Sequence, residues 1–257
     1  MIDRCVDRHD LIELFGRDRG AHVYALADLE EPCWSMSRWW RRGDAAVGEV
    51  RLPGVTDALV YAVSSADPDG TVALLADLAD ELPQRFVITG PTGLARRLST
   101  RYDAAWSGHF VKMRWTDRSR LLEPDGRVLS LGADDITDIS DLLSEQSDDA
   151  FFHAGLLDVG PFVGIRDDGR LVAVGGVHVM SREFGVAAIG NVFTARSMRG
   201  RGLARAVVSE ICRRLVPVAD VVALNVSVAN ASARYAYEQL GFAPIMEYDE
   251  AELSRRR

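Results

Sequence analysis

The residues best able to do chemistry lie in a short turn in the second half of the chain. The run Arg199-Gly200-Arg201-Gly202 follows a strand-forming stretch at 186–194 and opens a stretch with helical apolar periodicity. Such a turn exposes backbone N–H groups at the positive end of a helix, and arginine can add charge-assisted hydrogen bonds to phosphate oxygens. The expected diphosphate contacts are Arg199, Gly200, Arg201 and Gly202.

Other phosphate-binding motifs fit this turn less well. A Walker loop needs a lysine that is missing here, and a GxGxxG dinucleotide fingerprint would need glycine where Arg205 stands. The glycines could also serve only a tight strand-to-helix connection.

A second informative segment follows about thirty residues later, at 224–242. Asn230 is a good helix N-cap, and Gly241 suits the left-handed position after a helix. Asn230, Ala233 and Tyr237 share one helical face by their spacing of three and four. Each of these residues also has an ordinary structural explanation, so the informative feature is that the two segments occur together and in this order.

Together the two segments resemble the GNAT superfamily of acyl-coenzyme A-dependent N-acyltransferases over residues 128–250. The run Arg-Gly-x-Gly-Leu-Ala is similar to the family's pyrophosphate motif, and Asn-x-x-Ala-x-x-x-Tyr-Glu-x-Leu-Gly-Phe to its second motif. Arg196 and Ser197 depart from the residues common in the longer motif, which puts the loop's shape and one contact in doubt.

The resemblance implies a site at the end of the strand 186–194. There this strand would splay from the strand at 221–228, and the pantetheine arm of acetyl-CoA would bond to its exposed edge. The resemblance also implies that the amides from Gly200 to Ala204, those of Leu203 and Ala204 included, hold the pyrophosphate. The other cofactor-binding residues that it implies are Val192, Phe193, Thr194, Asn230 and Tyr237.

The implied reaction is direct attack of an amine on the thioester carbonyl in one ternary complex. A backbone N–H near Phe193 would polarise the carbonyl, and Tyr237 would donate a proton to the departing thiolate. The strand 186–194 carries no acid, so His178 is the first candidate for the base. Glu183, His153 and ordered water remain open, and Tyr237 could instead simply pack its helix onto the sheet.

The elements that must position these residues form a mixed α/β chain. Residues 1–30 read as helical, and both halves then follow a similar order of strands and helices, ending with a strand expected at 244–250. A polar break at 123–127 predicts domains at 1–123 and 128–257. The C-terminal domain is expected to have the GNAT fold, and the N-terminal domain is expected to be a degenerate, GNAT-like copy as in glycine N-acyltransferase-like proteins. Chance alternation of α and β elements would produce the same order.

The N-terminal half is expected to bind no coenzyme A. Its equivalent turn, at 66–70, contains two aspartates and a proline. The two acids would repel phosphate, and the proline lacks an N–H donor.

Composition limits the remaining function classes. The net charge of −8 argues against a nucleic-acid partner. The three cysteines are far apart and form no plausible metal set with the histidines, so no metal is expected. No secretion signal or membrane span is recognisable, which predicts a cytoplasmic protein without a membrane partner. The expected partner is a small-molecule amine, and the alternative function is a non-catalytic coenzyme A-binding sensor or scaffold.

Overall fold

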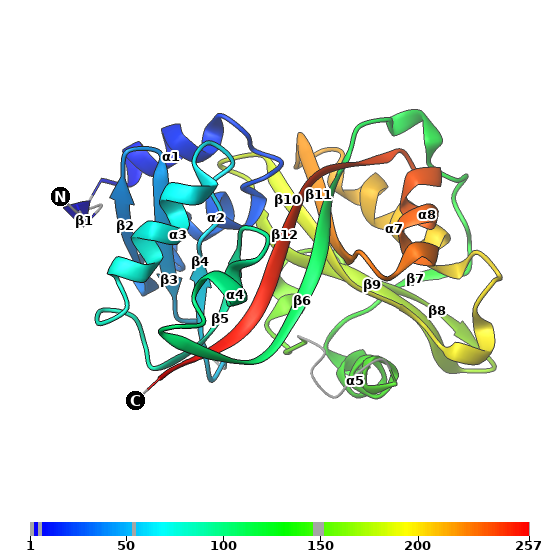
Figure 1. Ribbon diagram of the computed structural model, residues 1–257. Coiled ribbons are helices and arrows are strands. Elements are labelled where there is room, and N and C mark those ends of the chain that lie inside the picture. Colours follow the sequence, from blue (N-terminus) through cyan, green and yellow to red (C-terminus); the bar gives the residue numbers. More distant parts are fainter. Residues whose placement is uncertain (1–2, 5–6, 53–54, 146–151, 257) are drawn as a thin grey trace. The chain divides into compact units, whose positions relative to one another are not determined.

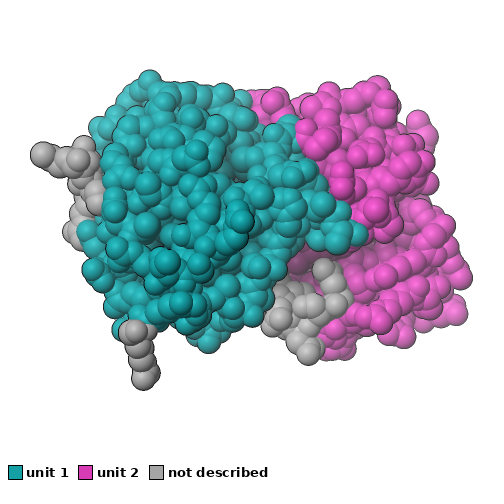
Figure 2. Space-filling model, viewed as in Figure 1, with its two compact units in different colours: residues 1–112, 226–229, 245–257 teal, residues 113–225, 230–244 magenta. Residues whose placement is uncertain are grey.

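The computed structural model describes residues 3–4, 7–52, 55–145 and 152–256, and the chain forms two compact units (Figure 2). The first unit comprises Met1–Lys112, Val226–Ala229 and Ile245–Arg257, and the second comprises Met113–Asn225 and Asn230–Pro244. Each unit is a mixed sheet with helices packed on it (Figure 1).

The sheet of the first unit has the strand order β1-β2-β3-β4-β5-β12-β6. Its strands are β1 (Asp3–Arg4), β2 (Ser37–Arg42), β3 (Ala45–Val50), β4 (Ala58–Tyr61), β5 (Arg85–Gly90), β12 (Phe242–Arg255) and β6 (Tyr102–Trp115). Its α-helices are α1 (Arg8–Gly16), α2 (Val23–Asp28), α3 (Pro68–Asp77) and α4 (Leu94–Arg97). A 3-10 turn, η1 (Trp34–Met36), precedes β2.

The core of the first unit also encloses charged groups. The ammonium of Lys112, which is only 1% exposed, donates to the Ala21 carbonyl at 2.9 Å and lies over the Tyr24 and Tyr248 rings. Burial lowers the pKa of Lys112 to about 8. Burial also raises the pKa of the Asp28 carboxyl to about 7. Both shifts record the cost of keeping a charge away from water.

The sheet of the second unit has the strand order β11-β10-β9-β8-β7. Its strands are β11 (Val221–Ser227), β10 (Val186–Thr194), β9 (Arg170–Ser181), β8 (Val163–Asp167) and β7 (Val128–Ser130). Its α-helices are α5 (Ile136–Ser144), α6 (Leu156–Val159), α7 (Leu203–Leu215) and α8 (Ala231–Gln239). Three 3-10 turns connect these elements: η2 (Arg118–Arg120), η3 (Ala133–Asp135) and η4 (Arg196–Met198).

Helix α7 is positioned by its apolar face. Val207 and Ile211 are fully buried, and they would be the first atoms met by a Cβ added at Gly175 of β9. Glycine at this position therefore lets the helix lie close to the sheet. Helices α5 and α7 cover opposite faces of this sheet (Figure 1).

One expectation for the first unit was wrong, and one strand was missed. Residues 1–30 are not one helical stretch: within the described part, a short strand at Asp3–Arg4 precedes two separate helices, while residues 1–2 and 5–6 lie outside the description. No strand was expected at Ser37–Arg42, yet β2 lies there and pairs with β3. Its tryptophans pack into the core, where Trp39 covers Gly48.

The compact units divide the chain differently from the linear boundary expected near residue 123. The strand expected at 244–250 extends to Arg255, because Asp249–Ser254 pair antiparallel with β5. The C-terminal strand thus completes the sheet that the N-terminal residues begin, while residues 113–123 cluster with the second unit. The assignment of residues 1–123 and 128–257 as two copies of one fold stays a prediction.

No helix in the described part of the chain is long and apolar enough to span a membrane.

Candidate functional site

Two neighbouring strands of the second unit, β10 and β11, stop pairing where the site was expected. Strand β10 pairs in parallel with β11 over four residue pairs, from Val186↔Val221 to Ile189↔Leu224. Beyond the last pair, β10 continues to Thr194 and β11 to Ser227. Past Ile189, the edge of β10 that faces away from β9 has no ladder partner on β11 and can receive an extended ligand.

A β-bulge lies in the part of β10 that pairs with β9 but not with β11. Gly190 opposes Gly176 and Phe193 opposes Val174, so β10 carries one more residue than β9 across this interval. Asn191, inside the bulge, has a φ of 51°, which is uncommon for a residue other than glycine. Bulges redirect backbone and side-chain groups and are frequent beside active sites.

The glycine turn has the backbone that the sequence predicts. Gly200 and Gly202 both have φ of +77°, and a Cβ at Gly200 would meet nothing within 4 Å, so the turn is open on that side. The Ala206 N–H donates to the Gly202 carbonyl at 3.1 Å and forms the first bond of α7. The N–H groups of Leu203, Ala204 and Arg205 therefore precede the first helical bond and point out of the helix.

The donor set around this turn fits a diphosphate. Residues 195–206 include four arginines and no acid. Arg201 is exposed, whereas the Arg199 guanidinium lies 5.4 Å from the centroid of the Phe193 ring and its Nε donates to the Thr194 carbonyl at 3.3 Å. Arg199 thus ties the turn to the end of β10, a contact that sequence reasoning did not foresee.

The second motif forms α8 and its two caps. The exposed Asn230 accepts hydrogen bonds through Oδ1 from the Ala233 N–H and the Ser232 hydroxyl, each at 3.1 Å. Gly241 has a φ of +86°, and a Cβ there would collide with the Asp117 carbonyl. Both residues therefore have the structural roles expected of caps, and the Asn230 oxygen that could reach a ligand is already engaged.

Tyr237 is buried on the inward side of α8. Its ring lies 6.1 Å from that of Phe242, centroid to centroid, in a tilted arrangement. Burial raises the pKa of its hydroxyl far above the ordinary value. The phenol is therefore protonated at neutral pH and can act as a donor.

His178 is held beside the bulge. The side chain is half-buried on β9, and its ring occupies the space that a Cβ on Gly190 would fill. Burial lowers the pKa of His178, the nearby His153 acts in the same direction, and a hydrogen bond with the Asn191 side chain partly opposes them. The other base candidate, Glu183, is exposed in the turn between β9 and β10. The structure thus brings His178 to the bulged part of β10.

Three polar side-chain atoms on β10 and β11 have no hydrogen-bond partner among the described residues. They are Asn191 Nδ2, Thr194 Oγ1 and Asn225 Oδ1, and all three are buried. Sequence reasoning included Thr194 but missed both asparagines. The available signal was an amide in the middle of an otherwise apolar strand.

The first unit has no comparable phosphate turn at its equivalent position. The Asp67 side chain accepts from the Gly70 N–H at 2.9 Å and caps α3. This helix N-terminus is therefore already occupied by a carboxylate of the chain itself.

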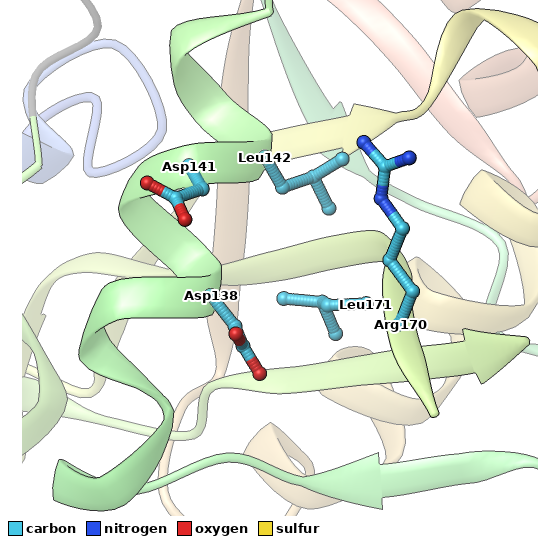
Figure 3. A pocket seen from close by; sticks show the side chains of 5 residues that line it. All are labelled: Asp138, Asp141, Leu142, Arg170 and Leu171. Carbon is cyan, nitrogen blue, oxygen red and sulfur yellow. The ribbon is translucent and has the colours of Figure 1, made fainter. Parts of the chain in front are cut away.

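A separate recess in the second unit lies between α5 and the start of β9 (Figure 3). Its volume is about 130 Å³, and it is lined by Asp138, Asp141, Leu142, Arg170 and Leu171. None of the predicted site residues lines it. No group of three or more His, Cys, Asp or Glu side chains in the described ranges is arranged to hold a metal ion.

Comparison with known proteins finds a family model that matches part of this chain. Residues 132–242 match the model of the acetyltransferase (GNAT) family. This range contains the bulged strand, the glycine turn and α8. Comparison with the curated proteins finds no significant match.

Solved structures share the fold. A GNAT-family protein from Novosphingobium aromaticivorans is 23% identical, with a TM-score of 0.61 over 81% of this chain and 89% of its own. A Drosophila protein is 15% identical, with a TM-score of 0.68 over 98% of both chains. A tandem GNAT protein from the clavulanic acid biosynthesis pathway is 14% identical, with a TM-score of 0.56 over 96% of this chain and 93% of its own.

The matched range, the separating strands and the glycine turn agree, and residues 132–242 form a domain of the GNAT acetyltransferase family.

Proposed function

We propose that the protein transfers an acetyl group from acetyl-CoA to a primary amine of a small molecule, by direct attack within a ternary complex. The observation that carries the proposal is the combination of separated strands with an open, acid-free glycine turn. Acetyl-CoA supplies the acyl group as an activated thioester.

The binding roles follow from the donors that each element offers. The N–H groups of residues 200–204 and the exposed Arg201 hold the diphosphate. The free edge of β10 at Val192, Phe193 and Thr194 holds the pantetheine arm as an added strand would be held. Because its oxygen caps α8, Asn230 can offer only its amide N–H groups to that arm.

The chemical roles follow from the protonation states of two side chains. The amine nitrogen forms the new bond to the acyl carbon and loses a proton, which the neutral His178 receives directly or through water. The carbon–sulfur bond breaks, and Tyr237 gives its hydroxyl proton to the thiolate. An N–H of the bulge near Phe193 stabilises the negative charge that develops on the carbonyl oxygen.

Two measurements test the proposal. Calorimetry with acetyl-CoA is expected to show saturable binding, and incubation with acetyl-CoA and a panel of primary amines is expected to release free thiol in an amine-dependent manner. Absence of binding at millimolar acetyl-CoA would overturn the proposal. Binding without thiol release for any amine would favour the non-catalytic coenzyme A-binding module. The cytoplasmic location stays a prediction.

A further inference from the structure

Two bulges on neighbouring strands bring a histidine and an asparagine together. Along the ladder with β10, His178 is the extra residue of β9, because the pairs on either side of it are Ala188↔Val179 and Ile189↔Val177. The bulge of β10 begins one residue later and contains Asn191. Bulges redirect side chains and recur beside active sites. Each strand therefore departs from its regular register at the residue that carries a polar side chain.

The backbone of β10 is shaped to receive the histidine ring. The ring of His178 occupies the space that a Cβ on Gly190 would fill. The next residue, Asn191, has a left-handed φ of 51°, a conformation that asparagine tolerates better than most residues other than glycine. Glycine thus leaves room for the ring, and asparagine permits the bulge beside it.

The two side chains are hydrogen-bonded to each other. The amide nitrogen of Asn191 has no partner among the described residues, so the amide contributes its oxygen, which can only accept. A ring N–H of His178 is therefore the donor. Burial lowers the pKa of His178, and this hydrogen bond acts against burial, as expected of an acceptor that stabilises the protonated ring. A neutral imidazole that donates from one nitrogen carries its lone pair on the other.

The charges around His178 stay the same when Asn191 is changed. His153, before α6, is the neighbour whose charge lowers the pKa of His178, and β10 carries no acidic or basic residue. The remaining charged residues on the elements that pack against β9 are Arg166 and Asp167 of β8, Asp138 and Asp141 of α5, Asp158 of α6, and Arg205, Glu210, Arg213 and Arg214 of α7. Removing the Asn191 side chain leaves all of these in place, so the change in the pKa of His178 measures the hydrogen bond itself.

We propose that Asn191 is a positioning residue, whose amide oxygen holds one N–H of His178 so that the other ring nitrogen can take the proton of the attacking amine. The inference rests on the proposed acetyl transfer and assigns how its base is oriented. As the amine nitrogen bonds to the acyl carbon, its proton passes to the unprotonated ring nitrogen, and Asn191 Oδ1 stabilises the imidazolium that forms. The carbon–sulfur bond breaks, and the thiolate takes its proton from Tyr237.

The first test is an NMR titration of His178, which does not depend on activity. Asn191→Gly keeps the left-handed backbone and removes the acceptor, so the pKa of His178 is expected to fall. Asn191→Asp puts a carboxylate at the same position, so the pKa is expected to rise by about 1 or more. Loss of one resonance in His178→Gln identifies the ring. A pKa of His178 that is the same in the wild type and in both Asn191 variants would overturn the inference.

Asp168→Gly is the matched control for the glycine variant. Asp168 also has a left-handed φ, of 46°, and it is exposed in the turn between β8 and β9. This variant makes the same kind of side-chain deletion away from the bulges, so the pKa of His178 and the turnover are expected to match the wild type.

The second test separates orientation from binding. In Asn191→Gly the ring is no longer held, so kcat is expected to fall about 10- to 10²-fold, while calorimetry should show unchanged affinity for acetyl-CoA. Asn191→Asp keeps an acceptor oxygen, so kcat at alkaline pH should return towards the wild-type value while the acidic limb of the pH profile moves to higher pH. Wild-type kcat and an unshifted limb in both variants would leave Asn191 with a backbone role only.

The two levels of the argument fail in different ways. If the wild-type protein binds no acetyl-CoA, or releases no thiol with any amine, the proposed function fails and the base role fails with it. The NMR titration then still decides whether Asn191 holds His178. If thiol release depends on the amine but His178→Gln keeps the wild-type acidic limb, acetyl transfer stands and the positioning role of Asn191 is wrong.

Discussion

At the scale of single residues, burial makes Tyr237 a proton donor and His178 a proton acceptor. Burial disfavours the charged form of both groups, so it raises the pKa of Tyr237 and lowers that of His178. At neutral pH the tyrosine keeps its proton and the histidine lacks one. A proton donor and a proton acceptor therefore coexist in one unit.

Removing the Tyr237 hydroxyl tests the donor. In Tyr237→Phe the thiolate must leave without a proton, so kcat is expected to fall about 10²-fold or more. The dissociation constant of acetyl-CoA, measured by calorimetry, should stay within about twofold because the ring still packs on Phe242. Unchanged turnover with unchanged binding would leave Tyr237 with a packing role only.

The acceptor is tested by the pH profile. His178 works only when neutral, and burial lowers its pKa, so protonation of His178 is expected to reduce kcat/KM only at acidic pH. His178→Gln should reduce the rate and remove this acidic limb. A variant with the same acidic limb would exclude His178 as the base.

These roles were predictable from sequence to different degrees. Tyr237 stands within a recognisable motif, whereas Asn225 and Asn191 are isolated amides in apolar strands. Their importance follows from the bulge and from the end of the strand pairing, and neither feature has a local sequence signal.

At the scale of elements, the site depends on an abrupt change from strand to helix. Strand β10 has the bounds expected from the sequence, and α7 begins at Leu203, directly after the second glycine. Strong β-forming residues followed by glycines determine such a junction locally. Strand β2 was missed because its arginines and paired tryptophans give no regular alternation, although its hairpin partner β3 follows directly in the sequence.

Gly202→Ala tests the glycine turn. A φ of +77° strains an L-residue, so the variant is expected to lose about 1 kcal/mol of stability and at least tenfold in acetyl-CoA affinity. Gly169→Ala is the control, because Gly169 has a φ of +82° and similar open space in the β8–β9 turn. Calorimetry should show normal acetyl-CoA binding in the control. Equal loss of affinity in both variants would mean that general strain is responsible.

At the scale of the whole molecule, the first unit carries buried charge that no proposed step uses. The carboxyl of Asp28 has an unfolded reference pKa of 3.8 and a pKa of about 7 in the fold. Between these values the folded chain keeps a proton that the unfolded chain releases. This group therefore makes stability fall as pH rises from about 4 to 7, by at most about 4 kcal/mol.

Asp28→Asn is expected to increase the free energy of unfolding at pH 8 and to change it little at pH 4, because the amide stays neutral throughout. Urea unfolding at the two pH values measures this difference. Glu13→Gln, an exposed position in the same unit, is the control and should show no such pH dependence. An equal effect of Asp28→Asn at both pH values would contradict the buried-carboxyl explanation.

The pairing of β12 with β5 has a consequence for the order of folding during synthesis. Ala251 and Leu253 of β12 are fully buried in the core of the first unit. A nascent chain of which only the residues up to Pro244 have left the ribosome therefore has an incomplete core in the first unit. In such a chain the edge of β5 that pairs with β12 is still unpaired. The part of the protein that is translated first can finish folding only after residues 245–257 emerge, and until then that open edge is a target for chaperones and for aggregation.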